Sequence, residues 1–226
     1  MVSPVFLLVH GWGFDASFWT PLRDALAGTD SIAWDLGFHG SLSCPPPPAG
    51  RPVIAVGHSY GLLWLLEKRP VAWQSLVSIN GFPRFAAGGD FPEGVPPRLL
   101  DRMIARFGEA PEAVYRDFMI RCGVADPSRA DLDPKALADG LNALRHWDAR
   151  SRMADLGPAD LVLAGRADPI VPEGLTKAGF SGQDIFWHES GHLLPLEAPE
   201  WCAARLRRLH GGLFGGEPAR HGAGWN

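Results

Sequence analysis

The chain has little cysteine, no excess of basic charge and no long apolar run. Its three cysteines are scattered and form no Cys-x-x-Cys pair, so neither a disulfide framework nor a zinc site is expected. A formal net charge of -4 argues against broad nucleic-acid binding. No apolar run approaches the roughly 18 residues of a membrane span, and residues 1–4 show no basic leader. We therefore expect a cytoplasmic protein that binds neither nucleic acid nor membrane.

Short apolar segments alternate with helical patterns, which is typical of a parallel α/β fold. The 226 residues, 46% of them hydrophobic, suit one core with a small insertion. Helical patterns cover residues 16–27, the segment after Ser59, and residues 199–210. Strand patterns cover residues 5–9, 31–35, 53–56, 75–79, 161–164 and 185–187. The sequence predicts a mostly parallel sheet of about six strands flanked by helices.

Two segments interrupt this alternation. Residues 37–51 contain four consecutive prolines, which disfavour a helix, so an extended polyproline crossover is expected. Residues 83–156 separate two core strands and carry helical patterns at 97–107, 111–121 and 134–147. We interpret them as a helical cap over the mouth of the sheet. The predicted division is a core of residues 1–82 and 157–210, this cap, and a glycine-rich flexible tail at 211–226.

Ser59 is the candidate nucleophile. The sequence Gly57-His58-Ser59-Tyr60-Gly61 joins a strand pattern to an apolar helical run. Such a turn holds a serine in strained backbone geometry and exposes its hydroxyl, and only glycine neighbours let the chain pass that closely. An isolated match would more often be an ordinary turn, but the strand before and the helix after favour a catalytic serine.

A serine nucleophile needs a base and a carboxylate that orients the base. Asp168 directly follows a strand pattern, although an isolated Asp168-Pro169 would be better explained as an Asx turn. His192 combines a position after the last strand with an adjacent glycine, and His188 is the alternative base.

The tetrahedral oxyanion needs amide donors. The candidates are Tyr60, directly after the serine, and Trp12, in the loop Val9-His10-Gly11-Trp12-Gly13 after the first strand. Without the serine motif, His10-Gly11 would be a plain strand-end turn. We expect the side chains of Trp12, Tyr60, His10 and Phe82 to line the substrate pocket.

These motifs together resemble the α/β-hydrolase superfamily, and the chain order Ser59, Asp168, His192 is the order of that superfamily. The likeness covers residues 4–82 and 157–210. The His10-Gly11-Trp12-Gly13 loop and residues 75–85 most resemble BioH-type carboxylesterases, which demethylate pimeloyl-acyl-carrier-protein methyl ester. The resemblance implies Ser59 as nucleophile, His192 as base, Asp168 as its partner, and the Trp12 and Tyr60 amides as the oxyanion hole. No metal or organic cofactor is required.

The chain departs from this family in three places. A short proline-rich passage replaces a helix before the nucleophile strand, Leu62 replaces a usual glycine, and the cap is short after Cys122. The substrate is therefore less firmly implied than the reaction.

The resemblance also implies a carrier-protein contact through arginines of the cap. Arg98, Arg102 and Arg106 recur every four residues and share one helix face, and Arg145 and Arg150 extend the set. Acids including Asp101 and Asp117 lie in the same segment, so an ordinary solvated face is the alternative.

Other functions stay open at this point. The same scaffold serves hydrolases of small esters, lactones or carbon-carbon bonds, and lyases. Dehalogenation is disfavoured because Ser59 occupies the nucleophile position. Two non-catalytic alternatives are a ligand-binding protein with a vestigial triad and an interaction protein that keeps the serine turn only as a structural element. A monomer is favoured.

Overall fold

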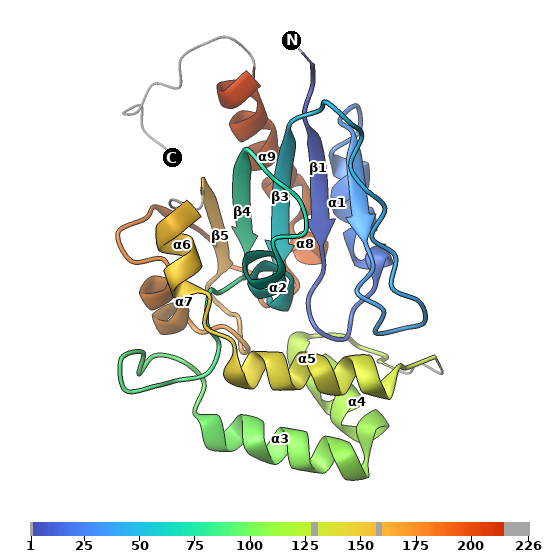
Figure 1. Cartoon of the computed structure of the whole chain (residues 1–226), viewed down its shortest axis with the longest axis vertical. Coiled ribbons are helices and arrows are strands. Elements are labelled where there is room, and N and C mark those ends of the chain that lie inside the picture. The colour runs from blue at the N-terminus through green and yellow to red at the C-terminus, as the bar shows by residue number, and fades with distance from the viewer. Residues whose placement is uncertain (1, 128–130, 157–159, 215–226) are drawn as a thin grey trace.

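Six parallel strands form a single sheet in the order β2-β1-β3-β4-β5-β6 (Figure 1). The computed structural model describes residues 2–127, 131–156 and 160–214. The strands are β1 (Val5–Val9), β2 (Ser31–Trp34), β3 (Val53–His58), β4 (Ser75–Ile79), β5 (Leu161–Gly165) and β6 (Ile185–His188). The predicted parallel α/β sheet is therefore confirmed, with β3 running two residues further than expected, up to the serine turn.

The four inner strands, β1, β3, β4 and β5, are buried along their whole length. A strand that is covered on both faces carries apolar side chains at nearly every position. The sequence therefore shows continuous apolar runs at these strands and no alternation of apolar and polar residues. The register pairs Val9 with Gly57 and His58 with Ile79, so the carboxyl ends of β1, β3 and β4 are level. The loops that follow these strands consequently meet at one edge of the sheet.

Helices cover both faces of the sheet (Figure 1). The 3-10 helix η1 (Ala16–Trp19) leads into α1 (Thr20–Ala25), so the single helix predicted at 16–27 is two shorter elements. On one face of the sheet, α1 packs against α8 (Leu194–Glu197) and α9 (Pro199–Phe214). Helix α2 (Tyr60–Lys68) covers the opposite face. The short α7 (Glu173–Gly179) follows β5.

The last helix corrects the predicted start of the tail. Residues 211–214 continue α9, so the flexible tail expected from residue 211 does not begin there. A helix can continue through Gly211 and Gly212 because glycine weakens a helix by only about 1 kcal/mol per residue. The rest of the predicted tail, residues 215–226, lies outside the described residues.

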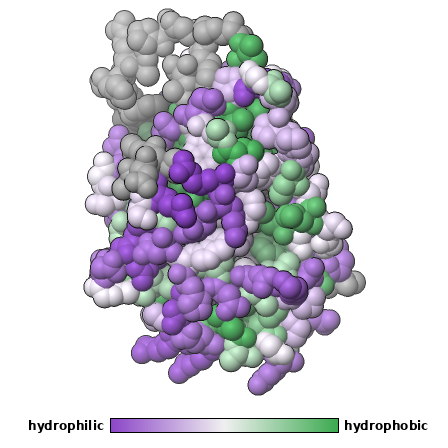
Figure 2. All heavy atoms as spheres, in the orientation of Figure 1, coloured by the Kyte–Doolittle hydropathy of each residue, from purple (hydrophilic) through white to green (hydrophobic). Residues whose placement is uncertain are grey.

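The segment between β4 and β5 holds α3 (Pro97–Glu109), α4 (Pro111–Cys122), α5 (Pro134–His146) and α6 (Arg150–Leu156). Each of the first three begins with proline, which is favourable in the first helical turn, where no amide donor is needed. They pack together beyond the carboxyl ends of the strands, and α6 instead contacts α2 (Figure 1). Hydrophilic side chains dominate the surface where α3 lies (Figure 2).

The crossover at residues 37–51 contains no helix, as expected from its prolines. Asp35 and Ser43 form an isolated antiparallel bridge, and the indole N–H of Trp34 donates to the carbonyl of Pro45 at 2.8 Å. These bonds hold the crossover against β2. Across the described ranges, no helix has the length and apolar character needed to cross a bilayer.

Candidate active site

Ser59 lies at the turn between β3 and α2 and has a left-handed backbone, with φ 53° and ψ -124°. This conformation is unfavourable for serine and persists only where the surrounding chain enforces it. A Cβ on Gly57 would collide with the backbone of Leu62, and one on Gly61 with the carbonyl oxygens of Val9 and His10. The two glycines therefore allow α2 to begin directly against the end of β1.

Ser59, His192 and Asp168 meet in the structure. His192 Nε2 lies 3.1 Å from Ser59 Oγ, and His192 Nδ1 lies 2.7 Å from Asp168 Oδ2. All three residues are buried, with exposed fractions of 5%, 1% and 6% respectively. Because the carboxylate only accepts, a neutral imidazole carries its proton on Nδ1 and presents a bare Nε2 to the hydroxyl.

His188, the alternative base, does not reach this cluster. Its ring packs against Trp201, with ring centroids 5.0 Å apart. It lies at the end of β6, in register with Gly165, whereas His192 lies in the loop beyond.

The two carboxylate oxygens of Asp168 have different partners. Oδ1 accepts the amides of Ile170 and Val171 at 2.7 and 2.9 Å, and Oδ2 faces His192. The Asx-type turn considered from the sequence is therefore present. It does not compete with the contact to His192, because it uses the other oxygen and fixes the carboxylate in place.

The amides of Trp12 and Tyr60 flank the serine turn. Tyr60 is the first residue of α2, so its N–H has no acceptor within the helix. Neither amide donates a hydrogen bond to another described residue. Gly11 lies directly beside Ser59, since a Cβ on this glycine would approach Ser59 Cβ to 3.1 Å. Tyr60 directly follows Ser59, and Trp12 directly follows Gly11, the glycine that lies beside Ser59.

Two histidines hold the loop that carries Trp12. His10 accepts the amide of Leu36 at Nε2 (3.0 Å) and donates from Nδ1 to the carbonyl of Gly11 (2.9 Å). His39 donates from Nε2 to the carbonyl of Gly13 at 2.8 Å. The carbonyls on both sides of Trp12 are therefore fixed. The contribution of His39, a residue of the crossover, was not evident from the sequence.

The four side chains expected to line the substrate pocket are all buried. The Trp12 indole packs edge-on against Phe118, with centroids 4.9 Å apart, and donates to the carbonyl of Leu137 at 2.8 Å. Tyr60 stacks on Trp147, Phe82 packs against Phe85, and His10 makes the bonds given above. Burial raises the pKa of the Tyr60 hydroxyl above its usual value. Their role toward substrate stays a prediction.

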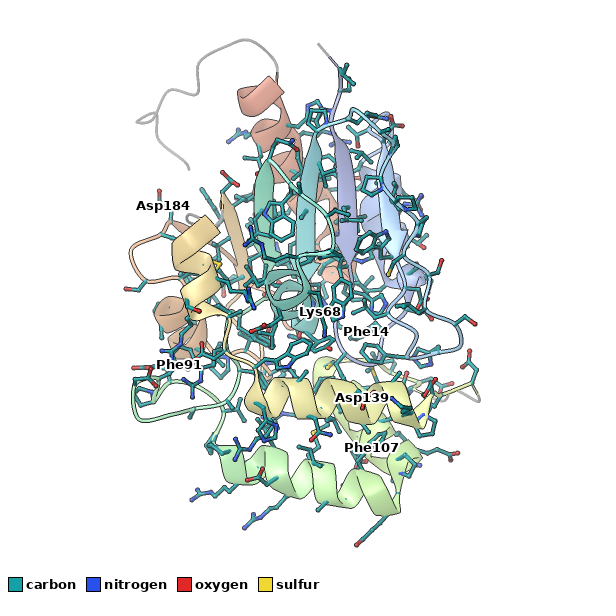
Figure 3. The ribbon with its side chains drawn as sticks, viewed as in Figure 1. Phe14, Lys68, Phe91, Phe107, Asp139 and Asp184 are labelled. Carbon is teal, nitrogen blue, oxygen red and sulfur yellow. The ribbon has the colours of Figure 1, made fainter. Side chains whose placement is uncertain are left out.

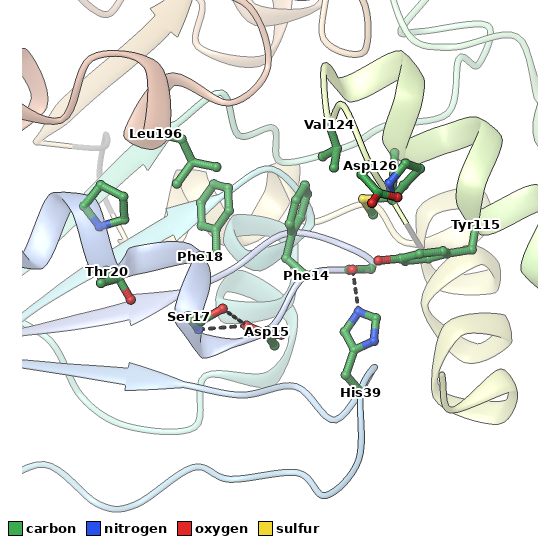
Figure 4. Close-up of a pocket in the computed structure, with 14 residues that line it drawn as sticks. Phe14, Asp15, Ser17, Phe18, Thr20, His39, Tyr115, Val124, Asp126 and Leu196 are labelled. Atoms are coloured by element: carbon green, nitrogen blue, oxygen red, sulfur yellow. Dashed lines mark hydrogen bonds between the residues drawn. The ribbon is translucent and has the colours of Figure 1, made fainter. Parts of the chain in front are cut away.

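A cavity of about 430 Å³ lies between the core and α4 (Figure 4). Its walls come from the Trp12 loop, from α4 and from the segment after His192, and they include Gly13, Phe14, Phe18, Tyr115, Met119 and Leu196. The rings of Phe14 and Phe18 also contact His58, the neighbour of Ser59, at centroid distances of 6.1 and 4.5 Å. Phe14 and Phe18 lie side by side in the wall of this cavity, with ring centroids 4.8 Å apart (Figure 4). No pattern in the sequence indicated a role for Phe14 or Phe18 at the site.

Three of the five cap arginines predicted to contact a carrier protein pair with aspartates. Arg106 contacts Asp117 at 2.8 Å, Arg145 contacts Asp101 at 2.6 Å, and Arg150 contacts both Asp90 and Asp148 at 2.6 Å. Arg98 and Arg102 are exposed on α3 and form no ion pair within the described part of the chain. Within the described residues, Arg106, Arg145 and Arg150 are therefore neutralised, whereas Arg98 and Arg102 keep their charge exposed on α3.

Comparison with known proteins decides the family. A family model described as "Alpha/beta hydrolase family" matches residues 47–205. The chain belongs to the α/β-hydrolase family. The match includes Ser59, Asp168 and His192, and the six-stranded parallel sheet has the architecture of this family.

Several relatives of this α/β-hydrolase are named pimeloyl-[acyl-carrier protein] methyl ester esterase. The protein from Stenotrophomonas maltophilia is 26% identical over 244 residues, covering 93% of this chain and 94% of the relative. The one from Xanthomonas oryzae pv. oryzae (strain MAFF 311018) is 27% identical over 203 residues, covering 75% and 79%.

Solved structures share the fold. An esterase from Exiguobacterium antarcticum superposes with a TM-score of 0.77 at 16% identity, covering 92% of each chain. A bromoperoxidase from Bacillus anthracis gives 0.75 at 18% identity, again covering 92% of each.

Proposed function

We propose that this α/β-hydrolase is a serine carboxylesterase with Ser59 as nucleophile, His192 as general base and Asp168 as the residue that orients the base. The observation that carries the proposal is the continuous hydrogen-bonded chain from Asp168 Oδ2 through the imidazole to Ser59 Oγ. Its donor and acceptor order is the one that removes a proton from the hydroxyl.

The reaction follows from this arrangement. His192 Nε2 takes the Ser59 proton as Oγ attacks the ester carbonyl, and Asp168 stabilises the imidazolium that forms. The amides of Trp12 and Tyr60 hold the oxyanion, a contribution of about 2.7–4 kcal/mol per donor in known cases. His192 then returns the proton to the departing alcohol. Water, activated by the same imidazole, cleaves the acyl-enzyme and restores Ser59.

For the substrate we favour an acyl methyl ester carried on an acyl carrier protein, specifically the pimeloyl ester of biotin synthesis, in the cytoplasm. The names of the relatives support this choice. Exposed Arg98 and Arg102 supply positive charge on α3 for an acidic carrier.

A generic esterase for small free esters is the second candidate. It is favoured by the ion pairs of Arg106, Arg145 and Arg150, which leave only part of the cap arginine set available to a carrier. Both candidate functions use the same reaction and differ only in whether the ester is free or attached to a carrier protein.

One pair of assays tests the proposal. Purified protein and its Ser59→Ala variant are compared on p-nitrophenyl acetate and on pimeloyl-acyl-carrier-protein methyl ester, and the two genes are introduced into a biotin-requiring strain that lacks its own methyl esterase. Hydrolysis that falls by about 10⁶-fold in the variant supports the serine mechanism. Rescue by the intact gene alone supports the carrier-bound substrate, while active protein without rescue favours the generic esterase. Equal hydrolysis by both proteins would refute the mechanism.

A further inference from the structure

Two buried side chains outside the proposed triad hold the backbone of His192. The Nε2–H of His58 and the side-chain amide of Asn80 both donate to the His192 carbonyl, each at 2.9 Å. The exposed fractions of His58 and Asn80 are 0% and 2%. A carbonyl oxygen has two lone pairs, so these two donors fully occupy it.

The other bonds of Asn80 connect the ends of neighbouring strands. Its Nδ2 also donates to the carbonyl of Gly191 at 3.0 Å, and its Oδ1 accepts the amide of Gly165 at 2.7 Å. All three partners of the side chain are backbone groups, whose donor or acceptor character is fixed. The amide group therefore fits in one orientation only.

The position of Asn80 in the fold explains its reach. It directly follows β4 and has a left-handed backbone, with φ 47°, a conformation that asparagine tolerates better than most residues. From there its side chain joins the end of β5 to the loop that carries His192.

His58 connects the same carbonyl to the serine turn. It is the last residue of β3 and directly precedes Ser59, so its hydrogen bond ties the backbone of the base to the strand of the nucleophile. Burial, with His192 beside the ring, holds the pKa of His58 well below its usual value. The ring is therefore neutral, and because Nε2 carries the proton, Nδ1 has none. Nδ1 finds no hydrogen-bond partner among the described residues.

We propose that Asn80 and His58 are positioning residues that fix the backbone of His192, and through it the imidazole, against Ser59. This inference rests on the proposed esterase function. The backbone at residue 192 determines where Nε2 lies, and a displacement of about 1 Å in such a contact lowers turnover by about 10²-fold. Neither side chain donates to the Ser59 hydroxyl or to the His192 ring. Asn80 acts through the loop, whereas the His58 ring also packs against the His192 imidazole, with ring centroids 4.9 Å apart.

Asn80→Asp is the most direct variant, because it keeps the shape and the tolerance of a left-handed backbone but replaces the donor with an oxygen that faces two carbonyls. We expect kcat on p-nitrophenyl acetate to fall by about 10- to 100-fold, with KM changed by less than about three-fold. Asn142→Asp is the matched control, since Asn142 is exposed on α5 and its side chain, among the described residues, donates only to the carbonyl of Ala138. It should leave both constants unchanged.

A second pair of variants serves if Asn80→Asp does not fold. His58→Gln keeps a side-chain N–H that can reach the carbonyl of His192, whereas His58→Phe keeps a ring against Phe18 but has no donor. We expect His58→Gln to retain clearly more of the wild-type kcat than His58→Phe.

Hydrogen–deuterium exchange of residues 189–193 gives a readout that needs no activity. Exchange should be faster in Asn80→Asp and His58→Phe than in wild type, and unchanged in Asn142→Asp. Wild-type exchange in this segment, or a kcat within about two-fold of wild type in a folded variant, would overturn the inference. Absence of Ser59-dependent hydrolysis in the wild type would instead refute the proposed function, and exchange alone would then decide whether the two residues hold the loop.

Discussion

The indole N–H of Trp12 donates to the backbone carbonyl of Leu137 at 2.8 Å, across 125 residues of sequence. Trp12 lies in the loop after β1, and Leu137 lies in α5. The indole ring also packs among Phe38, Phe107 and Phe118, and Phe107 is a buried residue of α3 on its side toward α5 (Figure 3). The loop proposed to supply one oxyanion donor is thus anchored in helices α3 to α5, beyond the carboxyl ends of the strands.

Replacing Trp12 with phenylalanine should weaken this anchor. Trp12→Phe removes a buried hydrogen bond and part of a packed ring, so we expect the free energy of unfolding to fall by about 1–3 kcal/mol in urea denaturation. Trp73→Phe is the control, since Trp73 is half-buried and its indole has no hydrogen bond to a described residue. Equal losses in the two variants would mean that the Leu137 bond contributes nothing.

Gly61 should tolerate no side chain. In Gly61→Ala the new Cβ would meet the carbonyl oxygens of Val9 and His10, which belong to backbone and cannot rotate away. We expect a loss of at least about 2–3 kcal/mol of stability, or no soluble protein. Gly108→Ala in α3 is the matched control, because nothing lies within 4 Å of its added Cβ. Alanine at position 108 should stabilise the protein by about 0.5–1 kcal/mol. A melting temperature of Gly61→Ala equal to that of the wild type would contradict the predicted clash.

Asp168→Asn should impair turnover much more than binding. The amide side chain would favour the opposite imidazole tautomer, with the proton on Nε2 facing Ser59, so kcat should fall by about 10³- to 10⁴-fold with KM little changed. The measurement is steady-state hydrolysis of p-nitrophenyl acetate. Asp184→Asn, an exposed site well away from α3 to α5 (Figure 3), should behave as wild type. A loss of less than about ten-fold for Asp168→Asn would argue that Asp168 does not orient the base.

Asp35 should make the fold sensitive to acid. Partial burial raises the pKa of its carboxyl, but the amide hydrogen bonds from Gly37 and Ala16 stabilise the charged form, and the pKa falls from 3.8 to about 2. A depressed pKa stabilises the fold above about pH 4, and that contribution is lost as the pH falls toward 2. Urea denaturation should show Asp35→Asn less stable than wild type at pH 7, by up to about 2 kcal/mol, with the difference shrinking below pH 4. A difference independent of pH would refute this account.

Local patterns in the sequence predicted the sheet and the meeting of Ser59, Asp168 and His192. The strand patterns are enough to predict this meeting because parallel strands in register end at the same edge of the sheet. The loops after β3, β5 and β6 therefore come together whatever lies between them in the chain. The serine turn was recognisable because its glycines are required by close backbone contacts.

Contacts between distant side chains were not predictable in this way. Arg145 and Asp101 are 44 residues apart, and Arg106 pairs with Asp117 on the next helix, so the spacing of arginines along one helix could not show which of the positive charges are neutralised. The roles of Asn80 and His58 depend on a carbonyl more than 100 residues away. Helices α7 and α8 are too short to give a periodic pattern.

Labelling with a fluorophosphonate probe, followed by peptide mass spectrometry, tests the central claim most directly. The account predicts one phosphonyl adduct, on the peptide that contains Ser59, formed rapidly by the native protein and slowly after His192→Ala or heat denaturation. A native protein that leaves Ser59 unlabelled, or a His192→Ala variant labelled at the wild-type rate, would contradict it.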